Sequence, residues 1–321
     1  MDEFSFIKSI KQKTYNQSSL IKGIGDDAAV FRQTHQDIVT AVDTFVEDIH
    51  FAKQTMQAYH VGYRVLAANL SDMAAMGAKP AYYLVSIVVP EHWSMGELSN
   101  IFKGMKSLAS NYNIDLIGGD SVSGEKLVIS ITVIGFVDKS KARFRHDAKA
   151  GDIVFVTGTL GDSQAGFYIL TNHGKYEDEG YYIKKHRMPE PQITFSRSLQ
   201  KIPRLSLNDI SDGIANETAE IAEASGVSIT LDDAEIPTSN SYHQFPAELR
   251  QQWKLFGGED FELIGTLPES DWLYVKQMAE RHDINVTKIG KVTNVSDSGT
   301  VYIHSNGKIE VLPKKGYTHL K

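Results

Sequence analysis

Aspartates recur beside glycine and other small residues at the ends of predicted elements. They are Asp26 and Asp27 in "GIGDD", Asp43 in "AVDT", Asp72 in "NLSDMAAMGA", Asp120 in "GGDSVSG", and Asp209 and Asp212 in "DISDG". Carboxylates at strand ends are expected to converge on one rim of a sheet, where α/β proteins bind ligands. Taken singly, each Gly–Asp pair is more often a turn or a helix cap, so the recurrence is what favours a site.

Carboxylates that lie close together cannot all stay ionised without a cation. Mg²⁺ suits such a set, because it takes hard oxygen ligands and keeps waters that phosphate oxygens can replace. We therefore expect metal ions to stand between these aspartates and a bound triphosphate. Asp72 carries the strongest signal, since an aspartate in an apolar helix is costly unless it is paired or metal-bound.

Other polar residues are more ambiguous. His50 in "EDIHF" is a core histidine, a general base or a substrate contact, and spacing alone favours the core. Arg143 and Arg145 in "KARFRHDA" suit nucleotide phosphates, because a guanidinium matches phosphate oxygens, but they fit a solvated linker equally well. "FGGEDFEL" brings Glu259 after two glycines that allow close backbone approach, with a strand-edge turn as the alternative. The chain has no Walker A, HRD or DFG motif, which excludes the two commonest kinase architectures.

Composition narrows the class of protein. The 321 residues are 41% hydrophobic, which is enough for two domains, and the net charge of -7 disfavours nucleic acid as a partner. The absence of cysteine excludes disulfides, zinc–thiolate sites and cysteine nucleophiles. The N-terminus does not read as a signal peptide, and the apolar stretches are too short to span a membrane. A cytoplasmic enzyme without membrane or nucleic-acid partners is expected.

Periodicity predicts the elements that position these residues. Helices are expected over 3–13, 58–80 (closed by Gly77 and Pro80) and 95–114, and strands over 37–43, 81–90 and 126–138. Residues 115–120 predict a short buried strand that opens into a turn. Strands and helices also alternate after residue 150, so the class is α/β or α+β. The boundary is expected near 139–150, with an N-terminal domain over 1–140 and a C-terminal domain over 148–321.

Taken in order, the motifs resemble the thiamine-monophosphate kinase family of the aminoimidazole-ribotide-synthetase-like (AIR-synthetase-like) ATP-binding superfamily. "NLSDMAAMGA", "DISDG" and "GGEDFEL" are specific to that family, whereas "GIGDDAAV" and "GGD" indicate only the superfamily. The resemblance covers nearly the whole chain. It implies a two-domain AIR-synthetase-like fold in which the N-terminal domain forms a β-barrel with its copy in a homodimer.

The resemblance also implies an activity. ATP and several Mg²⁺ ions are expected in the cleft between the domains, where the γ-phosphoryl group passes directly to thiamine monophosphate and gives thiamine pyrophosphate. No nucleophile or general base is assigned, because a phosphate monoester is already ionised near neutral pH and the transfer needs positioning and charge neutralisation.

Site residues follow from the match to the family's motifs. The expected Mg²⁺ ligands are Asp27, Asp43, Asp72, Asp120, Asp209 and Asp212. The expected ATP contacts are Gly119, Asp120, Arg145 and Ser211, and the expected substrate contacts are His50, Glu259 and Tyr317. One departure is the Ala41-Val42 pair before Asp43, where the family often has Ser-Thr, so any coordination there must come from a backbone carbonyl.

Rival interpretations stay open. Aminoimidazole-ribotide synthetase is expected to use a different substrate loop from "VDTFVEDIHF", and selenophosphate synthetase normally carries a reactive Cys or selenocysteine, which this chain lacks. A non-catalytic Mg-nucleotide-binding protein is the rival from another class, and the retained aspartates speak against it.

Overall fold

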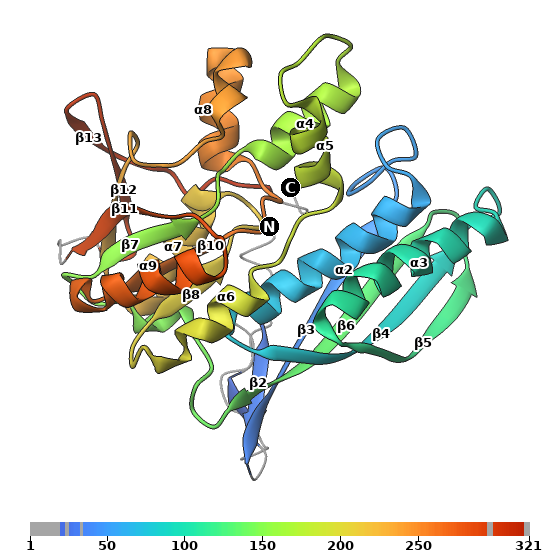
Figure 1. The fold of residues 1–321 in the computed structure, drawn as a ribbon, viewed down its shortest axis with the longest axis horizontal. Helices are drawn as coiled ribbons and strands as arrows, with labels where there is room; N and C mark the ends of the chain where they lie inside the picture. Colours follow the sequence, from blue (N-terminus) through green and yellow to red (C-terminus); the bar gives the residue numbers. More distant parts are fainter. Residues whose placement is uncertain (1–19, 23–25, 33–34, 294–297, 318–321) are drawn as a thin grey trace.

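The structure is a computed structural model that describes residues 20–22, 26–32, 35–293 and 298–317. The helix predicted over 3–13 lies outside the described residues. Strands and helices mix in both halves of the chain, so the predicted class is confirmed (Figure 1).

The N-terminal half is a six-stranded sheet covered on one face by two helices (Figure 1). Its strands run in the order β1-β2-β3-β6-β4-β5. Their bounds are β1 Leu20–Lys22, β2 Ala29–Arg32, β3 Gln36–Val46, β4 Lys79–Val89, β5 Asp115–Ser123 and β6 Val128–Asp138. The helices are α2 (Ala58–Ala75) and α3 (Met95–Tyr112). Both β3 and β4 are antiparallel to β6, so α2 connects two parallel strands and lies over the sheet.

Helix α2 is the central element of the molecule. Of its 18 residues, 14 are buried, because it packs against the N-terminal sheet on one side and contacts α3, α6 and β8 on others. Two glycines allow the close approach of α3. A Cβ on Gly62 would lie 1.8 Å from the carbonyl oxygen of Ile101, and one on Gly104 would lie 1.9 Å from that of Tyr59. Helix α2 ends at Ala75, and Gly77 follows with a φ of 67°.

The C-terminal half is a seven-stranded sheet with helices around it. Its strand order is β13-β12-β9-β11-β7-β10-β8. The strands are β7 Ile153–Thr157, β8 Ser206–Asp209, β9 Ser228–Asp232, β10 Leu263–Leu267, β11 Val286–Thr293, β12 Val301–Ser305 and β13 Lys308–Val311. The helices are α4 Asp162–Thr171, α5 Glu179–Arg187, α6 Ile193–Ser198, α7 Ile214–Ser225, α8 Ala247–Phe256 and α9 Trp272–Arg281. Helix α7 contacts β8, β9, β10 and β12, whereas α9 contacts β11.

Several predicted elements differ from the structure. The helix expected over 58–80 ends at Ala75, and the strand expected to end at Asp43 continues to Val46. The strand expected over 81–90 begins earlier, at Lys79, because a register shift between Pro80 and Tyr82 accommodates the proline that lacks a backbone N–H. The short buried strand expected over 115–120 is wrong: β5 has nine residues, forms the edge of its sheet, and is exposed throughout. Its apolar residues, which predicted burial, face outward from a single copy of the chain.

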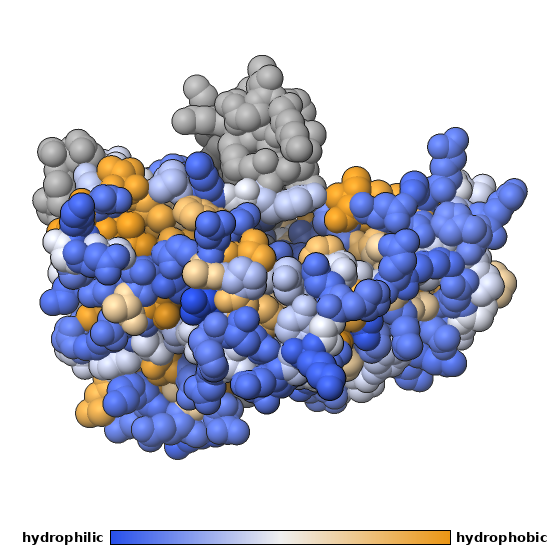
Figure 2. Space-filling model, turned by 90° about the horizontal axis from the view of Figure 1, so that it is seen from above, coloured by the Kyte–Doolittle hydropathy of each residue, from blue (hydrophilic) through white to orange (hydrophobic). Residues whose placement is uncertain are grey.

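The surface is predominantly hydrophilic on the face seen in Figure 2, where apolar patches are small and separated by polar residues. None of the described helices has the length and apolar character needed to cross a membrane.

Candidate functional site

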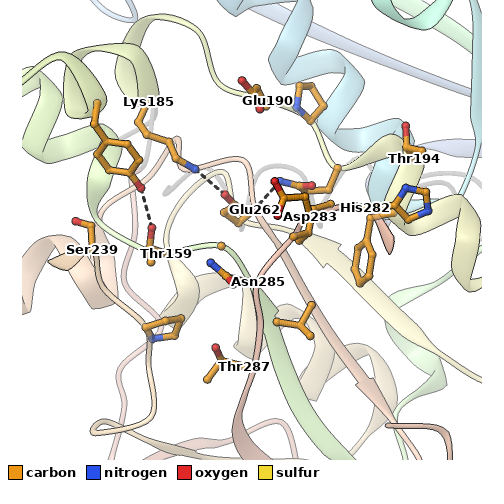
Figure 3. A pocket seen from close by; sticks show the side chains of 18 of the residues that line it. Thr159, Lys185, Glu190, Thr194, Ser239, Glu262, His282, Asp283, Asn285 and Thr287 are labelled. Atoms are coloured by element: carbon orange, nitrogen blue, oxygen red, sulfur yellow. Dashed lines mark hydrogen bonds and ion pairs between the residues drawn. The ribbon is translucent and has the colours of Figure 1, made fainter. Parts of the chain in front are cut away.

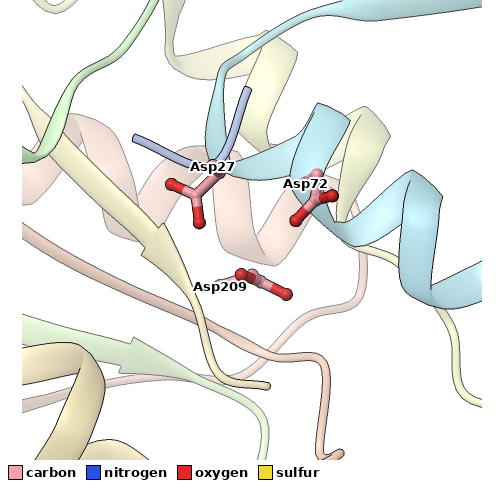
Figure 4. Close-up of side chains that lie close together, drawn as sticks. All are labelled: Asp27, Asp72 and Asp209. Atoms are coloured by element: carbon pink, nitrogen blue, oxygen red, sulfur yellow. The ribbon is translucent and has the colours of Figure 1, made fainter. Parts of the chain in front are cut away.

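Three carboxyl groups converge where the two halves of the molecule meet. Asp27, Asp72 and Asp209 each place one carboxylate oxygen within 4.8 Å of the others (Figure 4). Asp27 lies in the bend before β2, Asp72 lies on α2, and Asp209 is the last residue of β8. The bend that leads into the first sheet, the central helix and the second sheet therefore supply the cluster.

The cluster is strongly unfavourable in its fully ionised form. Burial raises the pKa of all three carboxyl groups, and for Asp72 and Asp209 it raises them well above the ordinary value. The negative charges of the neighbouring aspartates raise them further. Asp43 belongs to the same electrostatic group, because burial and the charge of Asp27 raise its pKa to about 6. A bound cation would reverse these shifts.

Arg145 compensates part of this charge. Its Nη2 donates to Asp27 Oδ1 at 2.7 Å, and its Nε donates to Asn208 Oδ1 at 3.1 Å. Burial opposes the charged guanidinium, but the carboxylates of Asp27 and Glu217 hold the pKa of Arg145 above its ordinary value. The side chain predicted to contact nucleotide phosphates therefore orients a cluster aspartate in this structure.

The residues of the cluster fit a divalent cation. The second oxygen of Asp27, Oδ2, is buried and receives no hydrogen bond within the part of the chain that the structure describes. Three carboxylates at this spacing offer the hard oxygen donors that Mg²⁺ prefers. The donor set therefore suits Mg²⁺.

The remaining predicted metal ligands occupy different positions. Asp43 lies on β3, and its backbone N–H donates to Asn69 Oδ1 at 3.2 Å. Asp212 follows β8 in the "DISDG" turn, and its backbone N–H donates to Glu217 Oε1 at 3.2 Å. Asp120 lies on the exposed edge strand β5, where its Oδ1 accepts a hydrogen bond from the N–H of Ser121. The structure thus brings together three of the six and places Asp43 in electrostatic reach of them.

The Ala41-Val42 pair, which stands where the family often has Ser-Thr, lies within strand β3. The pleat of β3 puts Ala41 in the core, 8% exposed, and turns Val42 to the opposite face, 62% exposed. Both are apolar, so no side chain before Asp43 replaces the missing oxygen donors.

The other predicted ATP contacts lie on two separate segments. A Cβ on Gly119 would lie 1.9 Å from the carbonyl oxygen of Val85, so the close approach of β5 to β4 requires glycine there. Ser211 lies in the turn after Asp209, and its carbonyl oxygen accepts a hydrogen bond from Glu259 N–H at 2.7 Å.

Two of the three predicted substrate contacts are neighbours. The rings of His50 and Tyr317 lie 6.5 Å apart between centroids, although the residues come from opposite ends of the chain. The Nδ1 of His50 accepts a hydrogen bond from Val46 N–H at 2.9 Å. Glu259, on the loop between α8 and β10, has a side chain that is 30% exposed and forms an ion pair with Arg64.

Polar residues that the sequence analysis did not single out support the cluster. Asn69 is fully buried on α2 and holds the backbone of Asp43, while its Nδ2 donates to Val65 O. Glu217 accepts hydrogen bonds from Asn208 Nδ2 at 2.6 Å and from Asp212 N–H, and burial raises its pKa to about 8. The sequence signal that could have identified these residues is a polar side chain on a helix face that is otherwise apolar.

A separate cavity of about 1280 Å³ lies beside α5 and the start of β11 (Figure 3). Lys185 Nζ lies 2.9 Å from Glu262 Oε1, and Gln192 Nε2 donates to Glu262 Oε2 at 3.0 Å. None of the predicted site residues lines this cavity. The acidic cluster and the cavity are therefore distinct features of the molecule.

Comparison with known proteins gives consistent relatives. The family models "AIR synthase related protein, N-terminal domain" and "AIR synthase related protein, C-terminal domain" match residues 25–137 and 149–303. The thiamine-monophosphate kinase of Bacillus subtilis (strain 168) is 43% identical over 328 residues, covering 100% of both chains.

Solved structures agree with these relatives. A structure described as "AaThiL complexed with AMPPCP and TMP" matches with a TM-score of 0.85 at 30% identity, covering 99% of this chain and 97% of that one. A thiamine-monophosphate kinase from Stenotrophomonas maltophilia K279a matches with a TM-score of 0.78 at 29% identity, covering 95% of each chain. The chain is similar to these proteins in both sequence and fold.

Proposed function

Because the chain belongs to the thiamine-monophosphate kinase family of AIR synthase related proteins, we propose that its acidic cluster is where the phosphates of its two substrates meet. The chain is an ATP-dependent enzyme that phosphorylates thiamine monophosphate. The predicted two-domain AIR-synthetase-like fold is likewise confirmed. Three carboxyl groups from both halves of the chain, within 4.8 Å of one another, are the observation that carries the proposal.

Asp27, Asp72 and Asp209 are the residues that would hold Mg²⁺. Bound Mg²⁺ supplies positive charge that neutralises phosphate oxygens and orients them for in-line transfer. The chain's own task is to aim these carboxyl groups at one point, and Arg145 holds Asp27 through its 2.7 Å contact. Asp43, Asp120 and Asp212 are proposed as further ligands of several Mg²⁺ ions.

The proposed contacts of the two substrates lie on other segments of the chain. Gly119, Asp120, Arg145 and Ser211 are proposed to contact ATP. His50, Glu259 and Tyr317 are proposed to contact thiamine monophosphate, and the proximity of the His50 and Tyr317 rings supports a shared role. No side chain is assigned as a nucleophile or a base, since the acceptor phosphate is ionised at neutral pH.

A homodimer is proposed from the edge strand β5. Leu116, Ile117 and Val122 are exposed on this strand, and an unpaired apolar edge invites pairing with another chain. An adjoining groove is lined by Ile87, Val89 and other apolar residues of β4 and α3. A second copy would cover this surface.

The domain limits and the compartment remain proposals. Domains over 1–140 and 148–321 fit the end of the first sheet at Asp138 and the start of the second at Ile153. We propose a cytoplasmic localisation, because ATP is available there.

A turnover assay tests the function. Purified protein with ATP and Mg²⁺ is offered thiamine monophosphate, an aminoimidazole-ribotide precursor and selenide in separate reactions. Formation of thiamine pyrophosphate, lost on chelation and restored by added Mg²⁺, is expected. Turnover of either alternative without turnover of thiamine monophosphate would overturn the assignment.

A further inference from the structure

Arg64 is a buried cation that joins the two halves of the molecule. It lies on α2 and is 1% exposed, yet its Nη2 lies 2.5 Å from Glu259 Oε2 in the other half. Its Nη1 donates to the carbonyl oxygen of His186 at the end of α5. The guanidinium carbon also lies 5.9 Å from the centroid of the Phe261 ring. One side chain of α2 therefore contacts α5 and two residues of the 257–262 loop.

The 257–262 loop has an unfavourable backbone. Glu259 has a φ of 70° and Phe261 a φ of 52°, and both are non-glycine residues in the left-handed region. Such conformations are unfavourable for non-glycine residues and persist where surrounding contacts fix them. The contacts of Arg64 fall on these same two residues, so the guanidinium is placed to stabilise the strained conformation.

The loop is also tied to the segment that carries Asp209. Glu259 N–H donates to the carbonyl oxygen of Ser211 at 2.7 Å, and Phe261 N–H donates to that of Ile210 at 2.9 Å. A Cβ on Gly258 would lie 2.4 Å from the Ser211 oxygen, so the two segments run in close contact. A displacement of Glu259 would therefore be transmitted to Ser211, two residues from Asp209 of the acidic cluster.

A buried charge at position 64 is costly for folding. A buried ion pair pays a desolvation penalty, and apolar residues of similar volume often replace such a pair without loss of stability. The Glu259 side chain, in contrast, is 30% exposed, so its carboxylate is held by Arg64 on one side and open on the other. An orienting role for Arg64 explains why a costly buried cation lies behind a partly exposed carboxylate.

We propose that Arg64 is a positioning residue that fixes the Glu259 carboxylate in the orientation in which it meets the positively charged thiazolium ring of the substrate. This inference rests on the proposed role of Glu259 as a substrate contact. The guanidinium holds Glu259 by charge and geometry, and it does not itself contact the reacting phosphates.

The test separates positioning from structural support. Arg64→Met is expected to raise the KM for thiamine monophosphate about tenfold, with the KM for ATP changed less than about twofold. Its thermal midpoint is expected to fall, because the buried carbonyl oxygen of His186 loses its donor, so the change in KM and not the stability separates this variant from its control. Arg64→Lys keeps the positive charge but has one nitrogen in place of the two that contact Glu259 and the carbonyl oxygen of His186. It is expected to bind thiamine monophosphate more tightly than Arg64→Met and more weakly than the parent protein. Binding of thiamine monophosphate, measured by calorimetry without ATP, gives a readout independent of turnover.

Arg143→Met is the matched control. Arg143 is also buried, at 5% exposure, but its Nη2 donates to the backbone carbonyls of Leu199 and Ile202 and has no contact with Glu259. This variant is expected to lower the thermal midpoint and leave the KM for thiamine monophosphate unchanged.

A double-mutant cycle with Glu259→Gln decides whether Arg64 acts through Glu259. The double variant is expected to bind thiamine monophosphate no more weakly than Glu259→Gln alone. If the two substitutions weaken binding of thiamine monophosphate independently, so that their fold-changes multiply in the double variant, the inference is overturned. An unchanged KM for thiamine monophosphate in Arg64→Met would also overturn it. If Arg64→Met fails to fold, the same cycle is run with Arg64→Lys and is read in the same way. If Glu259→Gln leaves binding of thiamine monophosphate unchanged, Glu259 is not a substrate contact and the inference about Arg64 fails with it. If the parent protein itself is inactive, the proposed function has failed.

Discussion

Replacing Asp43 by Asn should stabilise the metal-free protein and weaken its response to Mg²⁺. Burial and the charge of Asp27 raise the pKa of Asp43 from an ordinary 3.8 to about 6. At about 1.4 kcal/mol per pH unit, this rise is a free-energy penalty of about 3 kcal/mol once the group ionises. Asn has nearly the same shape and does not ionise, so the variant escapes the penalty.

The pH dependence gives the prediction its sign. A carboxyl group whose pKa is higher in the folded state binds a proton more tightly there, so the free energy of unfolding falls as the pH rises from 3.8 to about 6 and is then constant. In chelator, Asp43→Asn should therefore exceed the parent protein in stability by up to about 3 kcal/mol at pH 8 and by about half of that at pH 5.

Urea unfolding at pH 5 and pH 8, with and without Mg²⁺, measures these differences. Mg²⁺ should stabilise the parent protein more than the variant, because the ion balances the negative charge of the Asp43 carboxylate, which Asn does not have. Asp138→Asn, at the exposed end of β6, is the control and should change neither value. The reasoning is refuted if Asp43→Asn in chelator is no more stable than the parent at pH 8, or if its advantage is equal at the two pH values.

Three further outcomes are expected. Asp72→Asn should lose most of its turnover while it keeps a cooperative unfolding transition, and wild-type turnover at limiting Mg²⁺ would contradict its place in the acidic cluster. His50→Ala should raise the KM for thiamine monophosphate more than the KM for ATP, and the reverse pattern in steady-state kinetics would move His50 to the nucleotide. Leu116→Asp, on the exposed edge strand β5, should shift the protein from dimer to monomer in light scattering, and an unchanged mass would show that β5 is not the interface.

Much of the local structure could be predicted from the sequence. The apolar spacing over 58–80 predicted α2, which ends at Ala75 just before Gly77, and the alternating apolar residues predicted β6, because these patterns reflect periodicity within one element. The acidic residues were also visible beside small residues, although Asp43, Asp72 and Asp120 lie within β3, α2 and β5 and not at the ends of elements as predicted. The family motifs added the activity, which the similarity to thiamine-monophosphate kinases confirms.

Burial of β5 could not be predicted in the same way. "DLIGGD" has the apolar content of a buried strand, yet the strand order places it at the edge of the sheet with every residue exposed. Apolar content shows that a strand needs cover, and it does not show whether that cover comes from the same chain or from a partner.

The sequence by itself determined which residues could bind a metal and which elements carry them. Only the tertiary structure decided that Asp27, Asp72 and Asp209 meet, that Arg145 turns toward Asp27, and that Arg64 reaches Glu259. The physical reason is that side-chain periodicity encodes the faces of single helices and strands. Contacts between distant segments depend on how the two sheets pack on α2, which no local pattern records.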